Sequence, residues 1–198
     1  MSYEKIENKV ALITGGSEGI GFGIAKAFAE AGAKVAITGR DTNKLQAAKE
    51  KLGGKIQTID ADITQVELCA VTLDAVLREF GKLDILVNNA GVGIYKPVSQ
   101  TTIQDFDLLF NTNVRGLFAL TQSAIPELKK TRGNIINIGS VLGMRAMPVY
   151  SVYSASKAAV IMLTQLWARE LAPDVRVNSI SPGGVDTPLF DKAFGEKK

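Results

Sequence analysis

A tyrosine and a lysine stand four residues apart in a segment predicted to be helical. Tyr153 and Lys157 open the predicted helix 153–171, so their side chains share one helix face. A free tyrosine has a pKa of about 10, and a nearby ammonium group lowers that pKa by favouring the phenolate. The pair can therefore act as a general acid–base unit in a chain that contains no histidine. The alternative is a surface tyrosine packed on a lysine stem.

Two further polar residues could join this pair. Ser140 follows the predicted strand 134–138, at the end of the sheet where ligands bind, and its hydroxyl can hydrogen-bond a substrate oxygen. Asn113 lies inside the predicted helix 102–130, where asparagine is a poor helix former. It could face a water chain leading to Lys157, or it could be an ordinary exposed helix residue.

A glycine-rich turn joins the first predicted strand, 10–14, to the first predicted helix, 20–31. Residues 14–21 read Thr-Gly-Gly-Ser-Glu-Gly-Ile-Gly. Glycine lets backbone N–H groups approach a pyrophosphate, and the helix N-terminus adds a partial positive charge. This context favours a dinucleotide site over an ordinary turn. The expected cofactor contacts in the turn are Gly15, Ser17, Gly19, Ile20 and Gly21.

The end of the second predicted strand, 34–38, indicates which nicotinamide cofactor binds. An acid there would bind the ribose 2′-OH of NAD, but this chain has Gly39-Arg40. Gly39 leaves room for a 2′-phosphate, and Arg40 can clamp it. NADP(H) is therefore favoured, while NAD(H) stays open. Glu18 would repel the phosphate, Asp41 could neutralise Arg40, and Arg40 could simply face solvent.

Asp62 and Ile63 follow the third predicted strand and are expected to contact the adenine ring. Asp62 could equally cap the next helix together with Thr64.

Apolar runs of strand length alternate with longer amphipathic stretches along the chain. The predicted strands are 10–14, 34–38, 55–60, 83–87, 134–138 and 175–180, and the predicted helices are 20–31, 42–52, 65–80, 102–130 and 153–171. This alternation indicates an α/β fold with a parallel sheet covered by helices on both faces. Right-handed crossovers then imply a doubly wound, Rossmann-type sheet, with residues 1–198 forming a single domain.

Composition excludes several classes of protein. The 198 residues are 46% hydrophobic and 22% charged, as is typical of globular proteins. A net charge of +3 supplies no field for nucleic acid, and the absence of histidine removes the commonest metal ligand, so neither partner is expected. The single cysteine, Cys69, excludes an internal disulfide. With no apolar run long enough for a signal peptide or a membrane span, a cytoplasmic protein without a membrane partner is expected.

Together these motifs resemble the short-chain dehydrogenase/reductase family over residues 9–189. Residues 14–21 resemble the family's cofactor loop. Asn88 with Asn89, Ala90 and Gly91 resembles the motif that stabilises the sheet and lines the adenosine side. The segment containing Pro182, Gly183, Val185 and Thr187 resembles the loop beside the nicotinamide. Asn113, Ser140, Tyr153 and Lys157 match the catalytic tetrad in order and spacing.

The resemblance implies a role for each tetrad residue in interconverting a carbonyl and a secondary alcohol. Ser140 would hold the carbonyl oxygen, and Tyr153 would donate a proton as hydride arrives from the nicotinamide. Lys157 would bind the nicotinamide ribose and lower the pKa of the tyrosine. Asn113 would position a water that relays protons through Lys157.

The nearest likeness is to 3-oxoacyl-carrier-protein reductases, through residues 133–143. Four basic residues could meet an acidic carrier protein: Lys129, Lys130, Arg132 and Arg169. Lys129 and Lys130 could instead merely complement a helix C-terminus. The expected pocket walls, 93–95, 141–144 and Met147, are mostly apolar and favour a hydrophobic substrate. The charge of Arg145 could reverse this preference. Sugar, polyol and steroid substrates stay open, as does a cofactor-binding sensor without turnover.

The resemblance also implies features of the whole molecule. Relatives usually continue with a helical lid, another helix and a seventh strand, so six strands are expected here, with strand 175–180 as an exposed edge. Because this segment is missing, the resemblance leaves open whether the chain as written is active. The family pairs its two long helices, 102–130 and 153–171, with a neighbour, so a homodimer or homotetramer is expected. The alternative is that the apolar residues of these helices face their own sheet: Phe106, Leu109, Phe118, Ile161 and Trp167.

Overall fold

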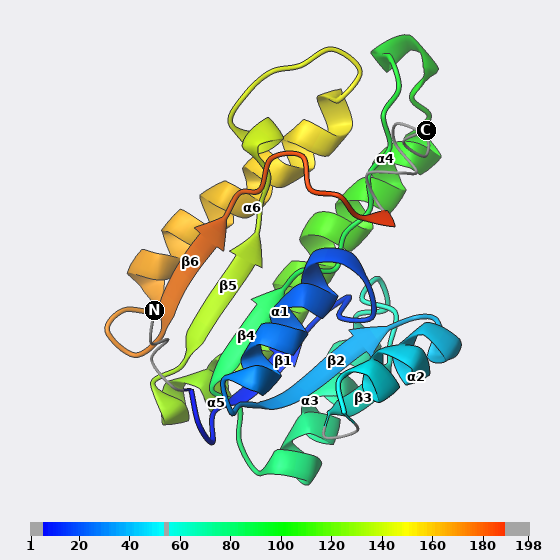
Figure 1. The fold of residues 1–198 in the computed structure, drawn as a ribbon. Helices are drawn as coiled ribbons and strands as arrows, with labels where there is room; N and C mark the ends of the chain where they lie inside the picture. Colours follow the sequence, from blue (N-terminus) through cyan, green and yellow to red (C-terminus); the bar gives the residue numbers. More distant parts are fainter. Residues whose placement is uncertain (1–5, 54–55, 189–198) are drawn as a thin grey trace.

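The computed structural model describes residues 6–53 and 56–188. They form a six-stranded sheet in the order β3-β2-β1-β4-β5-β6, and all neighbouring strands run parallel (Figure 1). The strands are β1 Val10–Ile13, β2 Lys34–Gly39, β3 Gln57–Asp60, β4 Ile85–Asn88, β5 Asn134–Ile138 and β6 Arg176–Ile180. The strand order reverses between β1 and β4, which confirms the doubly wound fold predicted from the sequence.

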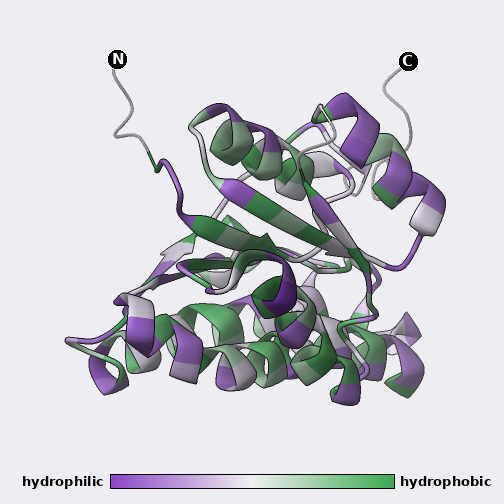
Figure 2. Cartoon of the chain, turned by 90° about the horizontal axis from the view of Figure 1, so that it is seen from below, coloured by the Kyte–Doolittle hydropathy of each residue, from purple (hydrophilic) through white to green (hydrophobic). Residues whose placement is uncertain are grey.

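Helices cover both faces of this sheet. They are α1 Gly19–Glu30, α2 Thr42–Lys51, α3 Glu67–Phe80, α4 Ile103–Phe110, α5 Leu117–Thr131 and α6 Ser151–Glu170. Helices α1 and α2 pack on one face, and α3, α5 and α6 pack on the other. Hydrophobic residues accordingly follow the strands and the sheet-facing sides of the helices (Figure 2).

The central strands have hydrophobic side chains on both faces. In β1, Val10 and Leu12 join the core beneath α3, α5 and α6, whereas Ala11 and Ile13 join the core beneath α1 and α2. All four side chains are fully buried. This is why β1 reads as a continuous apolar run and not as an alternating one.

The predicted helix 102–130 is interrupted in the structure. Helix α4 is followed by a π-helical segment, η2 Asn111–Gly116, and only then by α5. A side chain at Gly116 would run into the backbone of Ile63, so the two segments approach closely there. Thr112 and Asn113 are buried within η2, and π-helical turns of this kind are frequent at functional sites.

Other element boundaries differ from the predictions by a few residues. Helix α6 begins at Ser151 and α3 begins at Glu67. Lys55, predicted to open the third strand, lies outside the described residues, as does the chain from Leu189 onward. Strand β6 is an edge of the described sheet, as expected. Within the described part of the chain, no helix combines the length and apolar character that a membrane span requires.

Candidate active site

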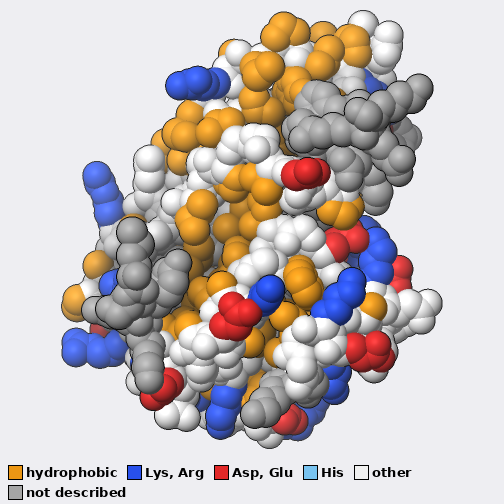
Figure 3. All heavy atoms as spheres, in the orientation of Figure 1, with side chains coloured by type: hydrophobic (Ala, Val, Ile, Leu, Met, Phe, Trp, Pro, Cys, Tyr) orange, Lys and Arg blue, Asp and Glu red, His pale blue; other side chains and the backbone are white. Residues whose placement is uncertain are grey.

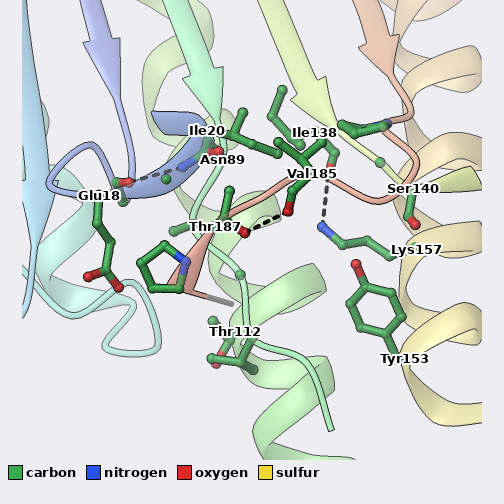
Figure 4. A pocket seen from close by; sticks show the side chains of 18 of the residues that line it. Glu18, Ile20, Asn89, Thr112, Ile138, Ser140, Tyr153, Lys157, Val185 and Thr187 are labelled. Carbon is green, nitrogen blue, oxygen red and sulfur yellow. Dashed lines mark hydrogen bonds between the residues drawn. The ribbon is translucent and has the colours of Figure 1, made fainter. Parts of the chain in front are cut away.

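A cavity of about 850 Å³ lies where the carboxyl ends of the strands meet. Segments that follow all six strands contribute to its wall (Figure 4). The lining residues are Gly15, Ser17, Glu18, Gly19, Ile20, Thr38, Gly39, Arg40, Asp41, Lys44, Ala61, Asp62, Ile63, Asn89, Ala90, Gly91, Val92, Tyr95, Thr112, Ile138, Gly139, Ser140, Val141, Leu142, Met147, Tyr150, Tyr153, Lys157, Pro182, Gly183, Gly184, Val185, Thr187 and Pro188. This set includes every predicted site residue except Gly21 and Asn113.

The turn between β1 and α1 has the shape that an anion requires. Gly15 and Gly19 have positive φ angles of 63° and 57°, which glycine adopts readily. The Glu18 side chain, at the N-cap of α1, makes no capping hydrogen bond, so the N–H groups of the first helical turn can serve a ligand. The turn is held in place by the Asn89 amide, which donates to the Thr14 carbonyl at 2.8 Å. These features fit the pyrophosphate of a dinucleotide.

Gly21 has a packing role that the sequence-based prediction did not anticipate. It does not line the cavity. A side chain at this position would collide with the carbonyl oxygen of Gly15 and the amide of Asn89. Gly21 therefore allows α1 to pack against the turn, and the prediction of a direct ligand contact is corrected.

Asp62 and Ile63, which were predicted to contact the adenine ring, both line the cavity. The Asp62 carboxylate accepts hydrogen bonds from the Thr64 N–H at 2.9 Å and from its hydroxyl at 2.8 Å. Asp62 thus bonds Thr64 in a local turn and does not cap α3, whose N-cap is Val66, so the alternative interpretation as a helix cap is not borne out; Asp62 still lines the cavity. Asn89, Ala90 and Gly91 line the wall beside it.

Charged side chains surround the cavity near the end of β2. Asp41 is the N-cap of α2 and accepts hydrogen bonds from the N–H groups of Asn43 and Lys44, each at 3.0 Å. Glu18 pairs with Lys44, with 2.6 Å between carboxylate oxygen and ammonium nitrogen. Arg40 lines the cavity beside them. Lys44 lies outside the motifs read from the sequence, although its position four residues after Arg40, at the start of the predicted helix 42–52, could have indicated a second cation here.

Ser140, Tyr153 and Lys157 lie together at the other end of the cavity (Figure 4). All three are buried, with Tyr153 8% and Lys157 6% exposed. The Lys157 ammonium donates to the Ile138 carbonyl at 2.8 Å and lies 6.0 Å from the centre of the Tyr153 ring. The Ser140 hydroxyl oxygen accepts from the Leu142 N–H at 3.2 Å, so its own hydrogen can be donated to the Tyr153 oxygen or to a ligand.

Burial dominates the pKa values of this cluster. It raises the pKa of Tyr153, and a hydrogen bond with Ser140 opposes the rise. Burial also lowers the pKa of Lys157 from 10.5 to about 8. The sequence led us to expect a lowered tyrosine pKa. The structure differs because desolvation of the phenolate outweighs the hydrogen bond with Ser140, while the Lys157 ammonium donates to the Ile138 carbonyl.

Asn113 lies beneath the cavity wall. Its side chain accepts from the Val92 N–H at 2.9 Å and donates to the Val92 carbonyl at 3.0 Å and to the Ser156 hydroxyl at 3.0 Å. At 1% exposure it is not the surface residue of the alternative interpretation. A methyl group added to Gly91 would lie 3.2 Å from the Asn113 carbonyl oxygen and 3.5 Å from the Lys157 ammonium. Asn113 and Lys157 therefore both border Gly91.

The segment after β6 passes over the carboxyl ends of the strands (Figure 1), and a methyl group on Gly19, at the start of α1, would lie 3.4 Å from Thr187. The predicted residues Pro182, Gly183, Val185 and Thr187 all line the cavity. The Val141 N–H donates to the Pro182 carbonyl at 3.0 Å, which ties this segment to the one after β5.

Comparison with known proteins decides the family. The model of the short chain dehydrogenase family matches residues 9–198. This chain belongs to the short-chain dehydrogenase family. A 3-oxoacyl-[acyl-carrier-protein] reductase of Thermotoga maritima is 36% identical over 193 residues, covering 95% of this chain and 78% of that protein. An L-fucose dehydrogenase of Bos taurus is 40% identical over 189 residues, covering 93% and 68%.

Solved structures agree with this family assignment. A 3-ketoacyl-(acyl-carrier-protein) reductase from Brucella melitensis, complexed with NADH, superposes with a TM-score of 0.91 at 37% identity, covering 93% of this chain and 79% of that one. An NAD⁺-bound xylitol dehydrogenase superposes with a TM-score of 0.87 at 35% identity, covering 91% and 72%. This short-chain dehydrogenase is thus an enzyme of the dehydrogenase/reductase class.

Some cavity residues lie outside the motifs that the sequence analysis singled out. Tyr150 was missed; its ring centre lies 4.9 Å from that of Tyr95, which in turn lies 5.5 Å from Tyr153. Burial raises the pKa of Tyr95 to about 12. Thr112 was also missed; its hydroxyl is buried and has no hydrogen-bond partner among the described residues. Of the expected walls, Gly93, Ile94, Gly143 and Met144 do not line the cavity.

Proposed function

We propose that this enzyme prefers NADP(H) and interconverts a carbonyl and a secondary alcohol, with Tyr153 as the proton donor and acceptor. The supporting observation is that one cavity joins the glycine turn at one end to Ser140, Tyr153 and Lys157 at the other. A cofactor lying between them would have its phosphates at the N-terminus of α1 and its reactive ring beside Tyr153.

Each buried residue then has a separate task. The Ser140 hydroxyl donates a hydrogen bond to the substrate oxygen. The Tyr153 hydroxyl gives that oxygen its proton during reduction. Burial raises the pKa of Tyr153 and opposes this transfer, whereas the hydrogen bond with Ser140 favours it. The bound nicotinamide supplies or accepts the hydride. Lys157 binds the cofactor ribose and returns a proton to Tyr153, while Asn113 holds the Val92 backbone and the η2 turn beside Lys157.

The preference for NADP(H) rests on Arg40. Gly39 ends β2 without a carboxylate, and the Asp41 carboxylate is engaged by the N–H groups of α2. The Arg40 guanidinium can therefore pair with a 2′-phosphate, and a hydrogen bond to a charged group contributes about 1.5–3 kcal/mol. That energy corresponds to a preference of about ten- to a hundred-fold.

Replacing Gly39→Asp together with Arg40→Ala tests this preference. The double variant adds a repulsive carboxylate and removes the attractive guanidinium, so it should bind NADH more tightly than NADPH. The dissociation constants of both cofactors are measured by titration. Gly39→Ala is the matched control, because a methyl group there lies 3.3 Å from Leu45 and so tests crowding alone. If the unmodified protein binds NADH as tightly as NADPH, the preference is wrong.

An apolar substrate fits the Tyr153 end of the cavity best. Leu142, Met147 and Tyr150 line it. Hydrophobic side chains also gather over the upper end of the molecule (Figure 3). Met144 and Val149, in the segment between β5 and α6, are 63% and 41% exposed. A hydrophobic carbonyl compound, including an acyl chain delivered by a carrier protein, is therefore our proposal. Reduction of acyl thioesters, diketones and free sugars by the purified enzyme tests it, and a preference for sugars would contradict it.

The case for a carrier protein at Lys129 and Lys130 is weaker than the case for an apolar substrate. Both residues lie in the last turn of α5, where they complement the helix dipole. Lys129 lies 3.8 Å from Asp174, and Lys130 lies 2.6 Å from Glu127. Exposed pairs of this kind can open, so they do not exclude a carrier protein, but the helix C-terminus and these pairs account for both lysines without one.

A further inference from the structure

An ion pair links the glycine turn to α2 at the edge of the cavity. The Lys44 ammonium lies 2.6 Å from a Glu18 carboxylate oxygen, and both residues line the cavity beside Arg40. The two side chains are 47% and 42% exposed. Exposed ion pairs contribute little to stability, so this pair can open at small cost.

At this edge of the cavity the positive charge comes from side chains and not from the N-terminus of α2. The Asp41 carboxylate occupies the N–H groups of Asn43 and Lys44, so the N-terminus of α2 offers few free donors. Leu45 is buried and anchors the first turn of α2 next to Gly39. Lys44 is thereby held in the first helical turn, on the cavity side, with a flexible stem that lets its ammonium move.

Arg40 alone does not balance the negative charges at this end of the cavity. The charged lining residues here are Arg40 and Lys44 against Glu18, Asp41 and Asp62. With Lys44 paired to Glu18, a phosphate placed beside Arg40 would also face the carboxylates of Asp41 and Asp62. A phosphate dianion carries more charge than a carboxylate and can compete with Glu18 for the ammonium.

We propose that Lys44 is a second cation for the 2′-phosphate of NADP(H), and that Glu18 competes with the phosphate for it. The inference rests on the proposed preference for NADP(H). Its consequence is that Glu18 weakens the binding of NADP(H) and leaves the binding of NAD(H) nearly unchanged, because NAD(H) has no phosphate at this position.

Three variants test the proposal: Glu18→Gln, Lys44→Met and the double change. Dissociation constants for NADPH, NADH and adenosine 2′,5′-bisphosphate are measured by calorimetry. Lys26→Met is the matched control, because it removes a lysine from an exposed pair with Glu30 on α1 that does not line the cavity. The NADH constant also reports whether each variant retains a folded cofactor site.

We expect Glu18→Gln to tighten NADPH binding about three- to ten-fold, since it removes a like charge and releases Lys44. Lys44→Met should weaken NADPH and the bisphosphate about ten-fold by removing a charged hydrogen-bond donor. The double variant should bind NADPH about ten-fold more weakly than Glu18→Gln does, because the contact itself is lost. NADH constants should stay within about two-fold throughout.

Several outcomes would overturn the proposal. If the double variant binds NADPH as tightly as Glu18→Gln, Lys44 only neutralises Glu18 and does not contact the phosphate. If Glu18→Gln shifts NADPH and NADH equally, Glu18 acts through the shape of the glycine turn. If no variant differs from Lys26→Met, the pair is an ordinary surface contact. An unmodified protein without any NADPH preference contradicts the proposed function instead, and Lys44 then keeps its role only if Glu18→Gln creates that preference.

Discussion

The Tyr153 hydroxyl lies in an environment that opposes its ionisation. The ring is buried, it meets Tyr95 edge-on at 5.5 Å, and the Ser140 hydroxyl is the hydrogen-bonding group that favours the phenolate. Tyr153 therefore stays protonated at neutral pH until a substrate oxygen accepts its proton, and Ser140 is the group that favours this transfer.

Tyr153→Phe isolates this role. The change removes only the hydroxyl, so the cofactor dissociation constant should stay within about two-fold while turnover falls about a hundred- to ten-thousand-fold. Cofactor titration and steady-state rates measure the two effects. Tyr95→Phe serves for comparison, because it keeps the ring packed on Tyr153 and should cost less turnover. Unchanged turnover in Tyr153→Phe would remove this residue from the mechanism.

Lys157 should make the stability of the ligand-free protein depend on pH. Its pKa falls from 10.5 in the unfolded chain to about 8 in the folded state because of burial. A base with a lowered pKa binds fewer protons when folded, so the free energy of unfolding should rise between about pH 8 and pH 10.5. Below that range, burial of the charged ammonium lowers stability.

Lys157→Met tests this relation. At pH 7 the variant should be more stable by about 1–2 kcal/mol, because the relief of burying a charge exceeds the loss of the bond to the Ile138 carbonyl. It should also lose the rise in stability above pH 8, and it should lose turnover. Urea unfolding at pH 7 and pH 9.5 measures both effects. A variant less stable than the unmodified protein at pH 7 would show that the hydrogen bond matters more than desolvation.

At the scale of elements, the π-helical segment η2 positions buried side chains beside the cavity. It turns Thr112 and Asn113 inward between α4 and α5, and the Asn113 side chain bonds both backbone groups of Val92. The segment that follows β4, which contains Gly91, is thereby held next to Lys157.

Asn113→Ala should reduce both stability and turnover. It leaves the N–H and the carbonyl of Val92 without their partner, which should cost about 1–3 kcal/mol in the free energy of unfolding. Asn113→Asp is the matched variant. It retains an acceptor for the Val92 N–H, but its carboxylate replaces the amide that donates to the Val92 carbonyl, so its loss of stability should be at least as large as that of Asn113→Ala. Thermal unfolding and the KM–kcat split measure the effects. Loss of turnover with unchanged stability would instead favour a direct role for Asn113 in proton transfer.

At the scale of the whole molecule, apolar side chains are exposed on the helices that are predicted to pair with a neighbouring copy. Phe106, Leu108, Phe118, Met162 and Leu166 are 42–54% exposed on α4, α5 and α6. In contrast, Leu109 and Trp167 are buried against the chain's own core, so only part of the predicted set faces outward. Exposed apolar patches of this kind mark association surfaces, and a homodimer or homotetramer remains our prediction.

Phe118→Asp combined with Leu166→Asp should reduce the oligomer to a monomer. Carboxylates buried in an apolar interface have no partner, so association should weaken by several kcal/mol, on the order of 3–5. Light scattering at micromolar concentration measures the mass. Val71→Asp is the control, because Val71 is 55% exposed on α3, which is not one of the helices predicted to pair with a neighbour. A monomeric unmodified protein would contradict the prediction.

The sequence by itself determined the architecture and the position of the site. Alternating apolar and amphipathic segments require a parallel sheet, and the carboxyl ends of parallel strands meet at one edge, so Ser140 after β5 and the glycine turn after β1 had to share a cavity. Only the tertiary structure decided the Glu18–Lys44 pair, the π-helical turn and the packing role of Gly21. These features depend on contacts between segments distant in sequence. The same holds for the raised pKa of Tyr153, because desolvation depends on how completely the surrounding chain excludes water, and no local spacing encodes that.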